Sequence, residues 1–290
     1  MKSPPFGYAR STTLADTFRL LAEGGPTAVV LAGGQSLLAG LAFRLSEPSV
    51  LVDITGVPEF QGVAAPAGGG LVVGALTTHA ELARSPLVRD RGPLLADAAA
   101  LIAHAAIRNR GTIGGSLAYA DPAAELPACC VALGARIVAV SPRGERHIAA
   151  DAFFTGLFST ALRNDELIRA VEFPPRGPGQ RSVVLELTRR AGDYAMAGIV
   201  LVADVDGPTL RAPRVVFFGV GPVPVVATRA AAALAAGGGG DAAVETAQAT
   251  LDHDLDPPDD MHGGADFKRQ LARTLLARAV AQMLDEGRAA

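Results

Sequence analysis

Two glycine-bearing segments of the chain have the residue types that bind phosphate. The first is Val30-Leu-Ala-Gly-Gly-Gln-Ser-Leu37, and the second is Asn109-Arg-Gly-Thr-Ile-Gly-Gly-Ser116. Glycine lets the backbone approach a ligand closely, and successive amide N–H groups in such turns form anion-binding nests. Ser36 can also cap a helix, whose N-terminus favours phosphate. Two such loops together suit the two phosphates of a dinucleotide cofactor.

Either loop taken alone also fits a plain tight turn, because short glycine motifs are common. Neither loop matches the G-x-G-x-x-G fingerprint, and the chain has no G-x-x-x-x-G-K-[ST] segment. These absences argue against NAD on a Rossmann domain and against P-loop chemistry.

Other residues with possible chemistry have simpler structural explanations. His104 stands in the apolar stretch Leu101-Ile-Ala-His-Ala-Ala, where we expect a core or capping histidine. Asp121 and Glu125 lie four residues apart at a predicted helix start, which by itself indicates an N-cap and an exposed charge. The adjacent Cys129 and Cys130 are expected to pack as small buried hydrophobes.

The acidic stretch Asp252-His-Asp-Leu-Asp-Pro-Pro-Asp-Asp260, followed by His262, contains several potential metal ligands. Its spacing fits neither an EF-hand nor a zinc motif. We therefore expect a solvated loop that leads into the last helix, with Asp259 or Asp260 near the positive end of the helix dipole. No metal ligand and no catalytic side chain is predicted in this chain.

Composition excludes several classes of protein. The chain has 290 residues, of which 49% are hydrophobic and 19% charged, so it is too apolar for disorder and long enough for about two domains. Its net charge of −3 offers no overall basic surface to nucleic acid. With no run of 18 apolar residues and no apolar N-terminal stretch, neither a membrane span nor a signal peptide is expected. Two adjacent cysteines favour a reducing cytoplasm and cannot ligate an iron–sulfur cluster.

The elements around the first loop alternate between helix and strand. Residues 14–21 have apolar side chains at helical spacing, and Thr12 or Thr13 precedes them as N-cap. Residues 28–32 form a short apolar run that predicts a strand leading into the loop, and residues 50–54 predict another. This βαβ order favours a small parallel or mixed sheet.

The second loop lies between a helix predicted over residues 94–106 and another over residues 122–133, for which Asp121 is the N-cap and Pro122 the first residue. A proline- and glycine-rich stretch at residues 174–179 predicts a linker. The remaining predicted segments are strands at 71–73, 135–140, 182–188, 197–205 and 210–219, and helices near Ala230, near Ala243 and over 267–284.

Four stretches of the chain point to one family. They are Ala32-Gly-Gly-Gln-Ser-Leu-Leu38 with Arg44 and Val52-Asp-Ile54, Ile107-Arg-Asn-Arg-Gly-Thr-Ile-Gly-Gly-Ser-Leu117 with Ala120-Asp-Pro-Ala-Ala-Glu-Leu-Pro127, Arg189-Arg-Ala-Gly-Asp-Tyr-Ala195, and Asp260-Met-His-Gly-Gly-Ala-Asp-Phe-Lys-Arg-Gln-Leu-Ala272. Together they resemble the FAD-binding (medium) subunits of molybdenum hydroxylases, including the carbon monoxide dehydrogenase medium subunits and the flavin domain of xanthine dehydrogenases. The matches follow the family's order and span nearly the whole chain.

The resemblance implies an α+β fold of the vanillyl-alcohol-oxidase and carbon monoxide dehydrogenase flavoprotein type. Two N-terminal α/β subdomains, residues 1–55 and 56–177, would clasp FAD. Residues 178–290 would form a C-terminal α+β domain with a three-stranded antiparallel sheet and helices.

The resemblance also implies the residues that hold the cofactor. The two loops would cradle the pyrophosphate, Glu125 would reach the cofactor, and Tyr194 would cover the isoalloxazine. The implied cofactor-binding residues are Val30, Leu31, Ala32, Gly33, Gly34, Gln35, Ser36, Leu37, Ile102, Thr112, Ile113, Gly114, Gly115, Ser116, Glu125, Leu167 and Tyr194.

Two positions are informative in the comparison with related flavoproteins. Ser116 stands where the family usually has asparagine, and serine lacks the second donor and the carbonyl of an amide. Gln35 stands where related oxidases often carry a histidine that can bond covalently to FAD. Glutamine has no such nucleophilic nitrogen, so non-covalent FAD is predicted.

The function implied is electron transfer within a larger enzyme. A large partner subunit would hold the molybdenum cofactor, a small partner would hold two [2Fe-2S] clusters, and this chain would pass their electrons through FAD to an external acceptor. A dimer of such heterotrimers is expected. One alternative is a stand-alone FAD-dependent reductase of the same superfamily, and another is a non-enzymatic nucleotide-binding module.

Overall fold

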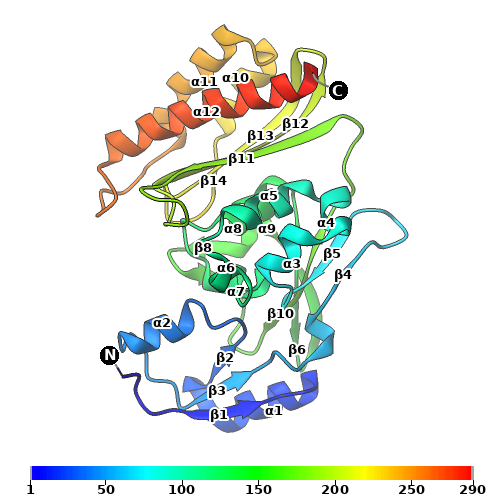
Figure 1. The fold of residues 1–290 in the computed structure, drawn as a ribbon, viewed down its shortest axis with the longest axis vertical. Helices are drawn as coiled ribbons and strands as arrows, with labels where there is room; N and C mark the ends of the chain where they lie inside the picture. Colours follow the sequence, from blue (N-terminus) through cyan, green and yellow to red (C-terminus); the bar gives the residue numbers. More distant parts are fainter. Residues whose placement is uncertain (1, 289–290) are drawn as a thin grey trace.

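The computed structural model describes residues 2–288 as three layers stacked along the long axis of the molecule (Figure 1). Each layer contains one main sheet. The strand orders are β1-β3-β2, β4-β5-β10-β6-β7 and β11-β12-β13-β14, and a small β8-β9 hairpin stands beside the second sheet. Within these residues, no helix combines the length and apolar character needed to cross a membrane.

The first layer confirms the predicted βαβ order, because both strand pairs of its sheet are parallel. Thr13 caps the first helix, accepting a hydrogen bond from the amide of Asp16 at 3.2 Å. The edge strand β1 was not predicted, since its residues are largely exposed and show no alternation. The elements are β1 (Gly7–Arg10), α1 (Leu14–Gly24), β2 (Val29–Leu31), α2 (Leu37–Ala42) and β3 (Val50–Asp53), with 3₁₀ turns at Gly25–Thr27 and Pro58–Phe60.

The second layer is an antiparallel sheet covered by helices. Its central strand, β10, lies between β5 and β6 although it follows both in the chain. The elements are β4 (Val63–Ala64), β5 (Leu71–Gly74), α3 (His79–Arg84), α4 (Pro86–Arg91), α5 (Pro93–Leu101), α6 (Ala105–Arg108), α7 (Ile113–Tyr119), α8 (Glu125–Ala132), β6 (Arg136–Ser141), β7 (Gly144–Ala149), α9 (Ala150–Phe153), β8 (Phe154–Gly156), β9 (Ser159–Thr160) and β10 (Leu167–Phe173).

The helix predicted over residues 94–106 is wrong in one respect, because the structure divides it into α5 and α6. Ala103 separates them with a φ of 40°. The Arg108 guanidinium donates to the carbonyls of Ile102 and Ala103, at 2.8 Å each, and so satisfies groups that a continuous helix would have bonded. His104 is therefore not in an apolar helix. It is exposed at the N-cap position of α6, where its side chain makes no capping bond.

The next predicted helix starts later than expected. The α8 helix begins at Glu125 rather than Pro122, and Asp121 does not cap it. Instead the Asp121 carboxylate accepts from the amide of Ala123 at 2.9 Å, which closes a local turn that competes with the helix. Glu125 consequently occupies the first helical position.

The third layer contains four strands, not the three predicted, because the two-residue strand β14 pairs with Val216 and Phe217 at the sheet edge. A two-residue strand is too short for a periodic sequence signal. The elements are β11 (Gln180–Leu187), β12 (Ala197–Asp206), β13 (Thr209–Phe218), β14 (Val225–Val226), α10 (Thr228–Gly237), α11 (Asp241–Asp254) and α12 (Ala265–Arg288).

Both faces of this third sheet are buried. One face, including Leu201 and Phe217, packs on α10, α11 and α12. The other face, including Val200 and Phe218, packs on the core of the second layer. That core contains Cys129 and Cys130, which are free thiols with no exposed surface, as predicted, and burial raises the pKa of both.

The acidic stretch before the last helix stabilises helix ends. Asp254 closes α11 and accepts from the amide of Ala230 at 2.9 Å. Asp259 accepts from the amide of Ala265 at 2.6 Å, at the start of α12, as predicted. Asp260 pairs with the buried Lys268 at 2.5 Å. Within residues 2–288, no group of three or more potential ligands is arranged to hold a metal ion.

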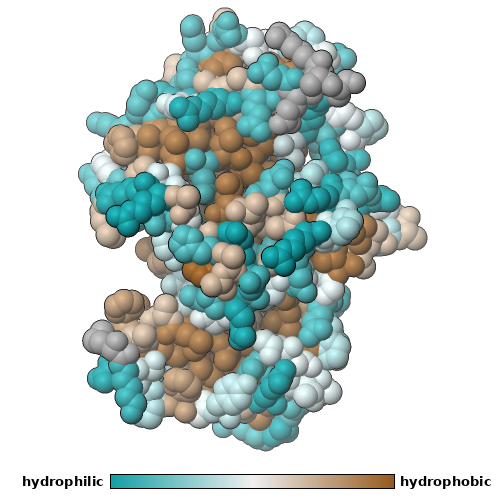
Figure 2. Space-filling view, in the orientation of Figure 1, coloured by the Kyte–Doolittle hydropathy of each residue, from teal (hydrophilic) through white to brown (hydrophobic). Residues whose placement is uncertain are grey.

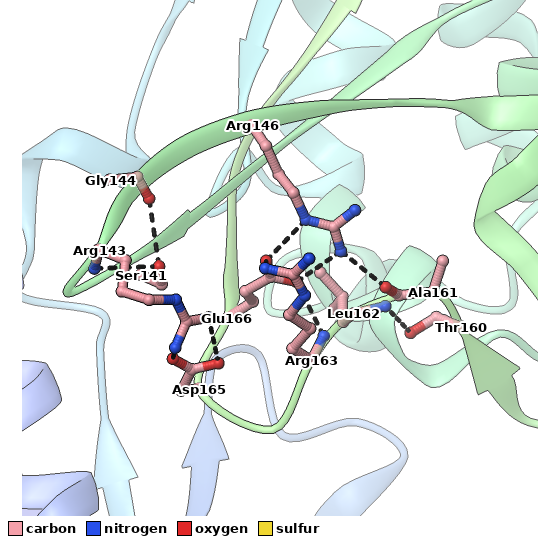
Figure 3. A network of polar contacts seen from close by, with 10 residues as sticks. All are labelled: Ser141, Arg143, Gly144, Arg146, Thr160, Ala161, Leu162, Arg163, Asp165 and Glu166. Atoms are coloured by element: carbon pink, nitrogen blue, oxygen red, sulfur yellow. Dashed lines mark hydrogen bonds and ion pairs between the residues drawn. The ribbon is translucent and has the colours of Figure 1, made fainter.

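An ion pair between the buried Glu166 carboxylate and the half-buried Arg146 side chain anchors the entry to β10 (Figure 3). The Glu166 carboxylate accepts from Arg146 Nε and Nη2, at 2.7 Å each, and from the amide of Arg163 at 2.8 Å. The Arg146 guanidinium holds the pKa of Glu166 at about 2, since its hydrogen bonds outweigh the cost of burial. These bonds link β7, which contains Arg146, to the start of β10, because Leu167, the first residue of β10, directly follows Glu166.

We expect Glu166→Gln to lower the free energy of unfolding by about 2–3 kcal/mol at neutral pH, because the substitution weakens charge-assisted hydrogen bonds in a buried site. The folded pKa is depressed, so the stabilisation is complete above pH 4.5 and is lost as the pH falls towards 2. Urea unfolding at several pH values measures it. Asp165→Asn, which alters the exposed neighbouring pair with Arg143, is the control and should change stability little. Equal losses for the two variants would contradict this account.

Candidate functional site

The two glycine loops meet between the first and second layers. A Cβ atom on Gly33 would lie 2.2 Å from the carbonyl oxygen of Arg110 and 2.9 Å from the Cα of Gly111. Only glycine permits this backbone contact. In the space-filling view, the surface is hollowed on the left between these layers, at the level between α2 and α7 (Figure 2). The loops therefore line one site, although Gly33 and Arg110 are 77 positions apart in the chain.

The first loop presents unpaired backbone donors. Strand β2 leads directly into this loop. The carbonyl of Leu31, the last residue of β2, accepts a hydrogen bond from the amide of Ile54 at 3.0 Å. From Gly33 to Leu37, no amide donates a hydrogen bond within the described residues. Gly34 adopts a left-handed φ of 73°, the kind of backbone turn from which anion-binding nests are built. This segment has the donors that a pyrophosphate requires.

Ser36 and Gln35 behave differently in the first loop. Ser36 occupies the N-cap position of α2 but makes no side-chain capping bond, so its hydroxyl stays available. The Gln35 side chain donates from Nε2 to the carbonyl of Gly33 at 3.1 Å. That bond folds the amide back on the loop. The residues before the loop, Val30 and Ala32, pack on the core beneath it.

In the second loop, the amides from Ile113 to Ser116 are already hydrogen-bonded to protein oxygens, which corrects the expectation of a second nest. The amide of Ile113 donates to Thr77 O at 3.0 Å, and that of Gly114 donates to Ala75 O at 2.8 Å. The amides of Gly115 and Ser116 are both bonded to Thr112, which caps α7. What this loop offers is the exposed backbone of Gly115 and the half-buried hydroxyl of Ser116.

A histidine that sequence reasoning missed lies under the second loop. The His79 ring packs against Gly111, with Nδ1 3.0 Å from the place where a Cβ would stand. The ring is 6% exposed, and neither nitrogen has a partner within the described residues. Burial lowers the pKa of His79 to about 4, so the ring is neutral at physiological pH. The sequence gives no sign of a functional role for His79, because His79 is simply the first residue of a short helix, α3.

Exposed aromatic rings gather beside the loops. Tyr119 at the end of α7 and Phe158 in the β8-β9 turn meet edge-to-face, with centroids 5.1 Å apart. Tyr194 is 61% exposed. Partial burial raises the pKa of Tyr194, and the nearby Asp121 and Tyr119 raise it further. The chain thus brings Tyr194, from the β11-β12 connection, next to the elements that follow the second loop.

Glu125 lies at the start of α8 with its carboxyl buried. Burial raises the pKa of Glu125 to about 8, and the nearby carboxylates of Glu186 and Asp121 contribute. Burial also raises the pKa of Glu186, on β11, to about 7. The raised pKa favours the protonated form of Glu125, which can donate a hydrogen bond. Sequence reasoning did not identify Glu186, whose position opposite α8 depends on the packing of the third layer.

The two remaining predicted residues lie farther from the surface. Leu167 begins β10 and is 9% exposed in the small core that joins the first two layers. It packs in the same core as Val30 and Ala32, which lead into the first loop. Ile102 is half-buried in the turn between α5 and α6. Leu167 thus packs beneath the first loop, whereas Ile102 packs against the core of the second layer.

This arrangement is a candidate site for a nucleotide cofactor. The residues fit FAD, because a row of free amides suits a pyrophosphate, a protonated carboxyl can donate to a polar ring, and exposed aromatic rings suit a flat one. A family model described as the FAD-binding domain in molybdopterin dehydrogenase matches residues 4–176. Another, described as the CO dehydrogenase flavoprotein C-terminal domain, matches residues 183–283.

Individual proteins agree with these family matches over their full lengths. The 6-hydroxypseudooxynicotine dehydrogenase complex subunit alpha of Paenarthrobacter nicotinovorans is 39% identical, covering 99% of this chain and 97% of its own length. The carbon monoxide dehydrogenase medium chain of Hydrogenophaga pseudoflava is 34% identical, with 97% of each chain covered. The structure of quinoline 2-oxidoreductase from Pseudomonas putida 86 superposes with a TM-score of 0.94 at 36% identity, covering 99% of both chains. The chain belongs to the family of FAD-binding medium chains of molybdopterin dehydrogenases.

We expect Gly33→Ala to weaken FAD binding by roughly ten- to a hundredfold, since the added carbon overlaps the Arg110 carbonyl and separates the loops, removing one hydrogen bond to a charged acceptor. Titration of the flavin-free protein with FAD measures the affinity. Gly40→Ala is the control in the adjoining helix, because a side chain there meets nothing within 4 Å. If Gly33→Ala bound FAD with wild-type affinity, the close contact between Gly33 and the Arg110 backbone would not be needed for FAD binding.

Proposed function

We propose that the chain is the FAD-carrying electron-transfer subunit of a multi-subunit molybdenum hydroxylase. The observation that carries this proposal is the clasp, in which Gly33 lies against the Arg110 backbone and unpaired amides line the first loop. Bound FAD supplies reversible two-electron chemistry. The chain's part is to bind and orient that cofactor, and it needs no catalytic acid or base for the oxidation of substrate.

The described residues divide the work of binding. The amides from Gly33 to Leu37 hold the pyrophosphate, and the Ser116 hydroxyl donates at the second loop. Glu125, whose raised pKa favours its protonated form, donates to the cofactor. Tyr194 covers the flavin ring and limits the access of water and acceptors. Where the family usually has asparagine, Ser116 offers a single hydroxyl donor in place of the two donors of an amide.

The partners follow from what the chain lacks. Its two cysteines are buried and cannot ligate a cluster, so we assign the [2Fe-2S] clusters to a small partner and the molybdenum cofactor to a large one. Relatives named medium chain or complex subunit support this division of labour and weigh against a stand-alone reductase. We propose a dimer of heterotrimers located in the cytoplasm.

We also propose a division into two FAD-binding subdomains, residues 1–55 and 56–177, and a C-terminal domain, residues 178–290. Each part contains one of the three main sheets. The boundary at residue 177 falls in the segment between β10, which ends at Phe173, and β11, which begins at Gln180. It also separates the two family matches.

The experiment that tests the function is purification of the native complex. We expect it to contain two further chains, with molybdenum, iron and FAD, whereas the chain expressed alone should bind FAD without iron or molybdenum. Acid precipitation should release the flavin into the supernatant, because Gln35 cannot form a covalent link. Stoichiometric iron in the single chain, or catalytic turnover of a small substrate by it, would contradict the proposal.

We expect Tyr194→Ala to change electron transfer more than FAD content. Stacking of one ring contributes about 0.5–1.5 kcal/mol beyond burial, which is small beside several phosphate contacts. Loss of the ring should shift the two-electron potential and the rate of acceptor reduction in the assembled complex. Phe267→Ala, which removes a 48% exposed aromatic ring on α12 of the third layer, is the control. Unchanged potential and rate would indicate that Tyr194 only packs.

A further inference from the structure

The connection between β11 and β12 carries Tyr194 and rests on the turn between α5 and α6. Gly192 has a left-handed φ of 86°, and a Cβ there would lie 2.7 Å from His104 Cε1 and 3.0 Å from the carbonyl oxygen of Ala103. The backbone two residues before Tyr194 therefore presses directly on this turn. A side chain at Gly192 would push the two segments apart.

The turn below is held in an unfavourable conformation. Ala103 has a φ of 40°, which an L-residue with a Cβ adopts only at a cost in free energy. The guanidinium of Arg108 donates from Nη1 to the carbonyl oxygens of Ile102 and Ala103, at 2.8 Å each. Arg108 thus holds the turn from below while the Gly192 backbone covers it from above.

The rest of the connection is fixed at its base and by a turn next to the tyrosine, in which the amide of Asp193 donates to the carbonyl of Arg190 at 3.0 Å. The amide of Met196 donates to the carbonyl of Leu187 at 2.9 Å, which closes the two strands. Arg189 Nη2 donates to the carbonyl of Met261 at 2.7 Å, on the side of the third layer. Tyr194 itself makes no hydrogen bond within the described residues and is 61% exposed. On the side of the second layer, the Tyr194 backbone has two supports: the turn under Gly192, and Ala195, which is 5% exposed in the core of that layer.

We propose that Arg108 is a positioning residue for Tyr194, because it holds the turn on which the Gly192 backbone rests and so determines where the Tyr194 ring lies over the flavin site. This inference rests on the proposed function, in which Tyr194 covers the flavin. Arg108 does not touch the cofactor. Arg108 acts indirectly. It bonds the carbonyls of Ile102 and Ala103, and the Gly192 backbone packs on Ala103.

The chain offers a clean probe of the position of Tyr194, since it contains no tryptophan. Tyr194→Trp introduces a single indole at this position of the full chain. Acrylamide quenching of its fluorescence reports the position of the connection in the flavin-free protein. Quenching by added FAD reports its proximity to the flavin. The two readings separate the support of the connection from the binding of cofactor.

In the Tyr194→Trp background, we expect Arg108→Ala to raise roughly tenfold the population of conformations with the indole displaced, because two hydrogen bonds from a charged donor are lost. Acrylamide quenching should increase and quenching by FAD should decrease, while the FAD affinity changes less than about threefold. Gly192→Ala should displace the connection from the other side and give the same pattern. It carries the test if Arg108→Ala does not fold.

The control is Arg89→Ala, which removes a similar arginine bond to a helix carbonyl, that of Ala83 at 2.7 Å. It should leave both readings unchanged. If Arg108→Ala and Gly192→Ala leave acrylamide quenching unchanged while FAD still quenches the indole, the inference fails and the proposed function stands. If FAD binds without quenching the indole when Arg108 is intact, the placement of Tyr194 over the flavin fails, and this inference with it. If FAD does not bind at all, the proposed function fails.

Discussion

The close approach of Gly33 to the Arg110 carbonyl is the constraint on which the site depends. It brings a loop of the first layer against a loop of the second without any intervening side chain. Because the amides from Gly33 to Leu37 have no hydrogen-bond partners among the residues that the structure describes, this contact places unpaired donors at the edge of a hollow. A larger residue at Gly33 would leave both loops formed but would separate them. The contact therefore connects two independent sheets into one binding site.

The two loops are alike in sequence but not in their hydrogen bonds. The second loop is bonded to the chain around Ala75 and Thr77 and to its own cap, Thr112, which makes it a rigid wall. The first loop leaves its amides free from Gly33 to Leu37 among the described residues, and the hydroxyl of Ser36 makes no capping bond. A hydrogen-bonded wall that faces a row of free donors suits a ligand whose phosphates must be held.

The third layer reaches the site through its packing. Because one face of the β11–β14 sheet is buried against the core of the second layer, the connection that carries Tyr194 meets the α5-α6 turn, and Glu186 meets Glu125. Both carboxyls have raised pKa values since they share a poorly solvated interface. The C-terminal part thus shapes one side of the candidate site although it contains neither glycine loop.

Much of the local structure follows from sequence alone. The helix spacing after Thr13, the apolar strands of the third layer and the glycine pairs of both loops are short-range patterns, and each appears in the structure near its predicted place. The family resemblance likewise depends on linear motifs, and the comparisons bear it out. Other features required the tertiary structure. The break at Ala103 depends on Arg108 reaching back to two carbonyls, and the central position of β10 depends on strands far away in the chain. The burial of His79 and Glu186 and the occupied amides of the second loop are also decided by neighbours distant in sequence. Local patterns encode which backbone conformations a segment prefers, whereas hydrogen-bond partners and desolvation depend on which segments pack together.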